Sequence, residues 1–262
     1  NLFDEDKKNP LFKTKLFSKE IDNPIGVAAG FDKNAEVYNS LFKLGFGFVE
    51  VGTVTPLKQY GNPKPRVFRL VEDEALINRL GFNNLGAENI ISKIKRNKKI
   101  GTLGVNIGPN KDSENRIKDY LKCLNTFHQE ADYITINISS PNTTDLRKFH
   151  NQKKLDDLLK SIEKEKENLG SKVPIVVKVS PDISANEIDE LSQVILSNDV
   201  KGIIVSNTSD ATRESLINIQ KHQKGGLSGK PITTKSTKLI NRFYKLLKGR
   251  VKIIGVGGID SG

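Results

Sequence analysis

Several small polar side chains gather in one short stretch, Tyr133 to Arg147 (YITINISSPNTTDLR). The alternation of Ile134, Ile136 and Ile138 predicts a β-strand, and Pro141, which has no N–H to donate, ends it. The uncharged hydrogen-bonding residues around that break are Asn137, Ser139, Ser140, Asn142 and Thr143. Such groups at a strand end are suited to holding a polar, planar ligand. Taken alone, the stretch is more typical of a surface turn rich in Asn and Ser.

The rest of the chain repeats the arrangement, which favours a binding site over a turn. Other apolar runs end in, or are followed by, a polar residue or a glycine: Lys33, Thr53, Asn106, Asn207 and Gly257. The carboxyl ends of parallel strands meet at one face, so we expect these residues to lie together. Lys178 stands inside an otherwise Ile- and Val-rich run. A buried lysine is costly unless it faces a charge, so we expect a functional role rather than a place at a sheet edge.

Seven apolar runs alternate with helical patterns, at residues 25–29, 48–53, 103–107, 133–138, 174–180, 202–206 and 252–256. Runs that are apolar almost throughout indicate parallel strands buried on both faces, and therefore an α/β fold. An open doubly wound sheet is one alternative. A (β/α)8 TIM barrel fits better, because nearly every run has its polar residue at the carboxyl end. We expect one domain over residues 1–262, with the eighth strand beyond Gly262.

Two features interrupt the alternation of predicted strands and helices. The long excursion from Val54 to Asn78 contains the run Arg66–Leu70, which predicts a β-hairpin inserted above the scaffold. The Gly-rich loop Gly225–Gly229 and the pair Gly257–Gly258 follow late strands, where barrels often hold a phosphate with backbone N–H groups. A single Gly pair would be equally typical of a tight turn. The first strand is followed by Ala28–Gly30 rather than GxGxxG, which argues against a Rossmann site. Asn34, shortly after it, is expected to cap the helix that follows.

Composition excludes several classes of protein. The formal charge of +11 comes from 42 Lys and Arg against 31 Asp and Glu, but the lysines are spread over helix faces without interleaved aromatic residues. This pattern favours a solvated surface over a nucleic-acid groove. Cys123 is the only cysteine, and no two of the three His stand at ligand spacing, so we expect neither disulfides nor a metal site. No apolar run approaches the ~18 residues of a membrane span, and the first residues carry no signal-peptide core.

A set of motifs, in the same order and spacing, resembles the class 2 dihydroorotate dehydrogenases from about Asn23 to Gly262. The motifs are AAGFDK (28–33), EVGTVTP (50–56), PRVFRL (65–70), INRLGFNN (77–84), GVNIG (104–108), NISSPNT (137–143), GGLSG (225–229) and IIGVGGIDSG (253–262). The class follows from Ser140, because class 1 enzymes use a cysteine as the base. Cys123 lies on a predicted helix away from these motifs, so we expect it in the core.

The resemblance implies that FMN oxidises dihydroorotate to orotate, a step of de novo pyrimidine (UMP) biosynthesis, and passes the electrons to a membrane quinone. The catalytic residues would be Ser140, as base for the C5 proton, Thr143, as a relay together with a water, and Lys178, which would stabilise the anionic reduced flavin. FMN would contact Ala28, Ala29, Gly30, Lys33, Thr53, Asn106, Asn137, Lys178, Ser206, Gly226, Gly257 and Gly258. The substrate would contact Lys33, Asn78, Phe82, Asn137, Asn142, Asn207 and Thr208.

The resemblance also concerns the electron acceptor. Arg69 matches a position that lines the quinone tunnel. Two N-terminal helices form this tunnel in class 2 enzymes, and we expect that the present sequence either begins after them or has lost them. The protein would sit peripherally on a bacterial cytoplasmic membrane or the mitochondrial inner membrane. Pro109 and Thr144–Asp145 depart from the commonest family residues, Lys and Pro-Gly. The alternatives are a class 1-like FMN barrel with a soluble acceptor and an inactive flavin-binding fragment.

Overall fold

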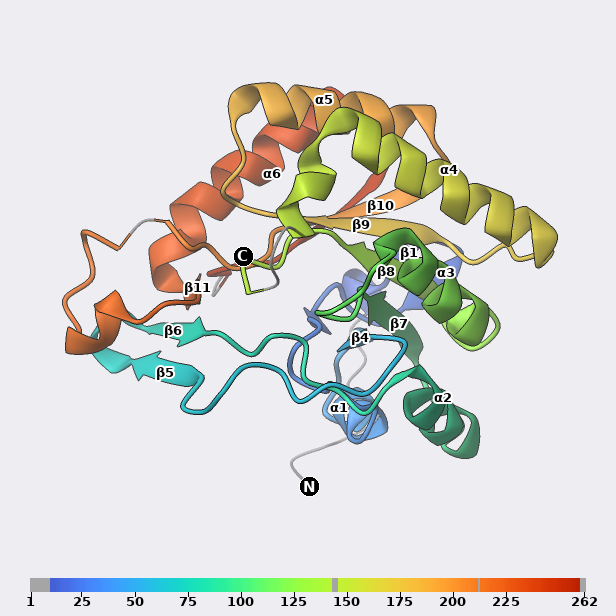
Figure 1. Cartoon of the computed structure of the whole chain (residues 1–262), viewed down its shortest axis with the longest axis horizontal. Helices are drawn as coiled ribbons and strands as arrows, with labels where there is room; N and C mark the ends of the chain where they lie inside the picture. The colour runs from blue at the N-terminus through green and yellow to red at the C-terminus, as the bar shows by residue number, and fades with distance from the viewer. Residues whose placement is uncertain (1–9, 143–145, 212, 260–262) are drawn as a thin grey trace. The chain divides into compact units, whose positions relative to one another are not determined.

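The computed structural model describes residues 10–142, 146–211 and 213–259. Its main sheet has seven strands in the order β12-β10-β9-β8-β7-β4-β3. Figure 1 labels β4, β7, β8, β9 and β10 of this sheet. The pairs β3–β4, β4–β7, β7–β8 and β10–β12 are parallel. The strands are β3 (Gly26–Val27), β4 (Phe48–Val54), β7 (Thr102–Ile107), β8 (Tyr133–Asn137), β9 (Ile175–Val179), β10 (Val200–Val205) and β12 (Lys252–Gly255). Each one falls within or overlaps one of the seven predicted runs.

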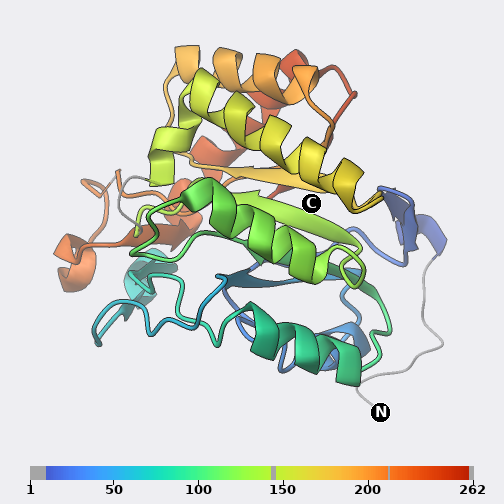
Figure 2. The same cartoon turned by 45° about the vertical axis from the view of Figure 1, so that its right-hand side comes forward.

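The chain divides into two compact units, of which the first covers residues 1–59, 82–136 and 164–175. It holds β3, β4, β7 and most of β8, and every residue of β4 and β7 is buried. Its helices are α1 (Tyr38–Lys43), α2 (Ala87–Arg96) and α3 (Arg116–Phe127), and α2 and α3 lie side by side (Figure 2). It also has a short hairpin of β1 (Thr14–Leu16) and β2 (Lys19–Ile21), which the sequence pattern did not indicate.

The turn before α1 differs from the prediction that Asn34 caps this helix. The Asp32 carboxylate instead accepts from the backbone N–H groups of Glu36 and Val37, at 2.9 and 2.8 Å. The Asn34 side chain accepts from the N–H of Leu85 at 3.0 Å. The cap prediction is therefore wrong, because a tertiary contact takes up the Asn34 amide. On α3 the prediction for Cys123 is confirmed, since it is fully buried.

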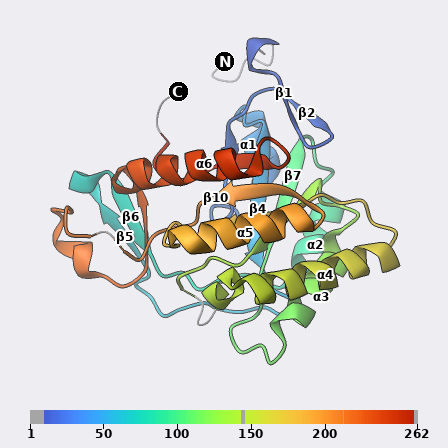
Figure 3. The ribbon, with the colours of Figure 1, turned by 90° about the horizontal axis from the view of Figure 1, so that it is seen from above.

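The second unit covers residues 60–81, 137–163 and 176–262. It contains β10, β12 and almost all of β9, together with α5 (Ala185–Ser197), α6 (Thr233–Leu247) and most of α4 (Gln152–Asn168). A capping box between Ser184 and Glu187 starts α5. Helices α5 and α6 lie side by side (Figure 3), and Arg242 on α6 contacts both carboxylate oxygens of Asp189 on α5 at 3.0 Å.

A small antiparallel sheet also belongs to the second unit. Strands β5 (Val67–Leu70) and β6 (Ala75–Asn78) form the predicted inserted hairpin, and β11 (Gly226–Gly229) pairs with β6. Residues of β11 were expected in a Gly-rich loop, which is wrong. Leu227 is fully buried in a cluster with side chains from β5 and β6, so burial overrides the local preference of glycine for loops. The 3-10 turns are η1 (Pro10–Phe12), η2 (Val71–Asp73), η3 (Leu146–His150), η4 (Ile219–His222) and η5 (Lys230–Ile232).

The described residues show neither a membrane-spanning helix nor a metal-binding cluster. No helix in the described ranges has both the length and the apolar character needed to cross a membrane. The same ranges contain no group of three or more His, Cys, Asp and Glu side chains that could hold a metal ion.

Candidate active site

The first unit holds a buried polar network centred on Glu50 of β4. The Glu50 carboxylate, 2% exposed, accepts from the Asn106 side-chain amide at 2.9 Å and from the Thr135 hydroxyl at 2.7 Å. Thr53 donates its hydroxyl hydrogen to Asn106 Oδ1 at 2.6 Å. Because a carboxylate only accepts, Glu50 determines which end of the Asn106 amide faces Thr53. Thr53 and Asn106 were predicted site residues, and the structure brings them together.

Glu50 itself was missed by the sequence reasoning. It is a charged residue inside an apolar run, as Lys178 is, and the same argument about the cost of a buried charge would have found it.

The other predicted residues of the first unit lie on nearby turns. Ala28, Ala29, Gly30 and Lys33 follow β3 and are half-buried. The Gly30 N–H donates to the carbonyl of Gly52 at 2.9 Å, which ties this turn to the end of β4. Phe82 is 7% exposed and has a φ of 52°, a left-handed value that is uncommon for a bulky residue.

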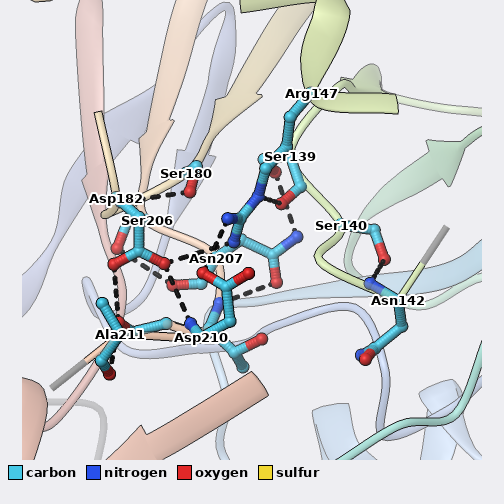
Figure 4. A network of polar contacts seen from close by, with 12 residues as sticks. Ser139, Ser140, Asn142, Arg147, Ser180, Asp182, Ser206, Asn207, Asp210 and Ala211 are labelled. Carbon is cyan, nitrogen blue, oxygen red and sulfur yellow. Dashed lines mark hydrogen bonds and ion pairs between the residues drawn. The ribbon is translucent and has the colours of Figure 1, made fainter. Parts of the chain in front are cut away.

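The second unit brings together the asparagines and serines at the end of β8 (Figure 4). Asn137 Oδ1 accepts from both the N–H and the hydroxyl of Ser139, at 3.2 and 3.1 Å. Asn207, which follows β10, donates to the Ser139 hydroxyl at 3.0 Å. The backbone N–H of Asn142 donates to Ser140 Oγ at 3.2 Å. This bond favours negative charge on the oxygen, which is the state a base needs.

The predicted substrate residues of the second unit belong to this network. Asn142 Nδ2 donates to the carbonyl of Asn78 at 3.1 Å, and Asn78 Nδ2 donates to the Gly226 carbonyl at 3.5 Å. The N–H of Thr208 donates to the Asn207 side chain at 2.8 Å. Hydrogen bonds and adjacent peptide units therefore connect the predicted substrate residues here, which are Asn78, Asn137, Asn142, Asn207 and Thr208. Thr143, the predicted relay, lies outside the described residues.

Lys178 and Ser206, from the list of predicted cofactor contacts, are both buried. Lys178 on β9 is 5% exposed, so the expectation of a lysine buried in a strand is confirmed. Ser206, 1% exposed, follows β10, and its N–H donates to the Val256 carbonyl at 3.0 Å.

Gly257 and Gly258 lie beside the first residues of α6, and Gly226 lies beside Thr208; all three were predicted cofactor contacts. A Cβ on Gly226 would lie 1.8 Å from Thr208 Oγ1, and one on Gly258 would lie 2.2 Å from Thr233 Oγ1, so neither position accepts a side chain. Gly257 has a φ of 116°, which L-residues rarely adopt. Ile232, the N-cap residue of α6, has no polar side chain with which to satisfy the first amides of the helix. This terminus is thus suited to an anion.

An ion cluster that no sequence pattern indicated lies beside the serines. It is formed by Asp182 after β9 with Arg147, Asp210 and Lys235 (Figure 4 labels the first three). Burial raises the pKa of Asp182, but hydrogen bonds from Asp210, Lys235 and Ser209 lower it by more. The pKa of this carboxyl is therefore held well below its usual range. No spacing rule in the sequence links these four residues, because their contacts span up to 63 positions.

Arg69, the predicted quinone residue, borders a cavity of about 340 Å³ beside the small antiparallel sheet. The lining is mostly apolar and comes from the turn end of the hairpin, where β5 ends and β6 begins, and from β11: Arg69, Leu70, Val71, Glu74, Ala75, Leu76, Ser228 and Gly229. Arg69 and Glu74 are the charged residues of this lining, and the volume of the cavity suits a small organic ring.

Comparison with known proteins decides the family. The family profile described as dihydroorotate dehydrogenase matches residues 11–262. The chain belongs to the dihydroorotate dehydrogenase family. A protein named dihydroorotate dehydrogenase (quinone) from Idiomarina loihiensis is 48% identical over 253 residues, which cover 94% of this chain and 75% of that protein. A protein of the same name from Buchnera aphidicola is 47% identical over 262 residues, which cover 97% of this chain and 78% of that protein. The predicted family and quinone-dependent class are confirmed.

The fold of the family agrees as well. The crystal structure of the Eimeria tenella dihydroorotate dehydrogenase in complex with ferulenol matches with a TM-score of 0.94 and 38% identity. The match covers 99% of this chain and 76% of that one. Together with the seven predicted strands, which form one sheet, it confirms the predicted α/β fold of the TIM-barrel class.

Proposed function

We propose that this chain oxidises dihydroorotate to orotate and passes two electrons through FMN to a quinone, a step of pyrimidine biosynthesis. The observation that carries this proposal is the hydrogen-bonded network of asparagines around Ser140, in a chain of this family. Each asparagine amide offers both a donor and an acceptor, which matches the alternating N–H and C=O groups of the dihydroorotate ring.

Ser140 is proposed as the base. It removes the proton from C5 while hydride leaves C6, so the ring loses two hydrogens and gains a C=C bond. Serine is a weak base, but the Asn142 N–H that donates to Ser140 Oγ stabilises its ionised form. The role of Thr143 as relay, and those of Lys33 and Phe82 toward the substrate, stay predictions.

FMN is the proposed cofactor, and the residues of each unit suit it. In the second unit, the glycines around the amino terminus of α6 suit its phosphate, and Lys178 brings a buried positive charge. In the first unit, Thr53 and Asn106 offer an oriented hydroxyl and amide to a polar ring edge. When bound, FMN accepts the hydride and delivers the electrons to the quinone.

The quinone is proposed to enter the cavity beside Arg69, whose guanidinium can donate to a quinone oxygen while Leu70, Val71 and Leu76 contact the ring. Quinones partition into membranes, so the protein would associate peripherally with one, at the bacterial cytoplasmic membrane or the mitochondrial inner membrane. The net charge of +11 would favour anionic headgroups modestly.

Anaerobic mixing of the flavin-loaded protein with dihydroorotate tests the proposal. We expect the flavin absorbance to bleach, and a soluble quinone analogue to restore it where fumarate and NAD do not. Efficient reoxidation by fumarate would favour a class 1-like enzyme. Bound flavin that dihydroorotate does not bleach would mark a flavin-binding protein without this activity.

A further inference from the structure

Arg147 lies in an ion cluster for which the proposed reaction has no role (Figure 4). Its guanidinium contacts Asp210 Oδ1 at 2.7 Å, Asp182 Oδ2 at 3.3 Å and the backbone carbonyl of Ser139 at 3.4 Å. A quarter of the arginine side chain is exposed. One side chain therefore joins three separate segments: the end of β8 and the residues that follow β9 and β10.

Asp182 holds the arginine in place. Its carboxylate is a tenth exposed and also accepts from the Ser209 hydroxyl at 2.6 Å, the Asp210 N–H at 2.9 Å and the Lys235 ammonium. These donors stabilise the ionised form of the Asp182 carboxylate, and together they restrict it to one orientation. The guanidinium that it faces is oriented in turn.

The carbonyl that Arg147 contacts belongs to the peptide unit that joins Ser139 to Ser140. The Ser139 side chain is held independently by Asn137 and Asn207. The peptide that carries Ser140 is thus fixed by a cation at its carbonyl and by amides at the preceding side chain. Covalent geometry places the guanidinium within about 9 Å of the Ser140 hydroxyl.

We propose that Arg147 is a positioning residue for the base: it fixes the peptide that carries Ser140, and its charge, balanced by Asp182 and Asp210, determines the pH at which the serine accepts a proton. This inference rests on the proposed function, in which Ser140 removes the C5 proton.

The charges predict opposite effects for the two partners. Replacing Arg147 by a neutral residue leaves the aspartates in excess, which disfavours an anionic Ser140 and moves the pH profile of flavin reduction upward. Neutralising Asp182 leaves positive charge in excess and moves the profile downward. At this separation, in a partly buried site, we expect each shift to be roughly half to one pH unit. Other ionisable side chains on the elements that meet here include Lys148 and His150 on η3, Lys178 on β9, Glu187 on α5 and Lys235 on α6, and these stay the same in every variant.

The test is stopped-flow reduction of the bound flavin by dihydroorotate from about pH 6 to about pH 10, with Arg147→Gln, Arg147→Lys and Asp182→Asn. We expect an upward shift for Arg147→Gln, a downward shift for Asp182→Asn and a profile near wild type for Arg147→Lys, which keeps the charge. The matched controls are Arg242→Gln and Asp189→Asn, which break an ion pair between α5 and α6. They should leave the profile unchanged.

A purely structural role would slow both variants without opposite shifts, and that result would overturn the inference. So would shifts of both variants in the same direction. If Arg147→Gln fails to bind flavin, the inference requires a downward shift in Asp182→Asn together with a profile near wild type in Arg147→Lys, and an unshifted profile in Asp182→Asn overturns it. Ser140→Ala separates the two proposals. If it reduces flavin as fast as wild type, the assignment of the base fails; if it is slow while Arg147→Gln and Asp182→Asn keep the wild-type profile, only the role of Arg147 fails.

Discussion

The Glu50 carboxylate accepts a hydrogen bond from the Asn106 side-chain amide at 2.9 Å, and both side chains are almost completely buried. This one contact orients the amide, and through it the Thr53 hydroxyl. Glu50, which was not among the predicted site residues, thus orients two residues that were, Asn106 and Thr53.

Glu50→Gln should weaken flavin binding. A glutamine amide donates as well as accepts, so it no longer forces the Asn106 amide into one orientation. We expect the dissociation constant of FMN, measured by fluorescence titration, to rise roughly tenfold, and the melting temperature to fall. Glu20→Gln, on the exposed face of β2, is the control and should change neither quantity. Unchanged FMN affinity in Glu50→Gln would show that Asn106 does not depend on the carboxylate.

Removing the charge of Lys178 should lower the midpoint potential of the bound flavin. A buried cation stabilises the negative charge that reduction adds, so Lys178→Ala should also retain FMN less well. Spectroelectrochemical titration of flavin-loaded protein measures the potential. An unchanged potential would mean that the lysine serves packing alone.

Arg69→Ala should raise the KM for quinone while dihydroorotate reduces the flavin at a near-normal rate. The reason is that the Arg69 side chain borders the apolar cavity and is not part of the network around Ser140. Stopped-flow of each half-reaction separates the two effects. Arg250→Ala, an exposed arginine after α6, serves as the control. An Arg69 variant impaired only in the dihydroorotate half-reaction would contradict the quinone assignment.

His150 should make the protein less stable in acid. It is 3% exposed, and among the described residues its Nε2 has no hydrogen-bond partner. Burial lowers the pKa of His150 to about 4; the Glu187 carboxylate opposes this shift and the Arg147 cation adds to it. Between about pH 6.5 and pH 4 the unfolded state binds a proton that the folded state does not, so stability falls as the pH falls through this window. The largest loss is about 3 kcal/mol.

Urea unfolding at several pH values measures this loss. His150→Gln, which cannot titrate, should show a flatter dependence between pH 6.5 and 4 than the wild type. Equal slopes for the two proteins would rule out His150 as the source.

The sequence predicted the main sheet well because strands buried on both faces leave long apolar runs, such as PIVVKVS around Lys178. It did not predict β11, because the partner of these glycine-rich residues, β6, lies about 150 positions earlier in the chain. Local preference cannot show such a pairing.

The candidate site divides in the same way. Asn137, Ser140 and Asn207 could be predicted because each follows a recognisable strand, and the resemblance to a family assigned their roles. The side chains that hold them could not, since Arg147 meets Asp182 and Asp210 only after folding. Asn34 shows the opposite error. Its position in the sequence favoured a helix cap, but its side chain accepts a hydrogen bond from the Leu85 N–H instead.

The central claim is that Ser140 removes the C5 proton of dihydroorotate. The most direct measurement is anaerobic stopped-flow reduction of the flavin in Ser140→Ala, with the amount of bound FMN checked by absorbance. We expect FMN to stay bound and its reduction to slow by a factor on the order of 10² to 10⁴. Ser140→Cys should retain part of the rate, mostly at higher pH, where the thiol ionises. Reduction of flavin by Ser140→Ala at the wild-type rate would contradict the assignment.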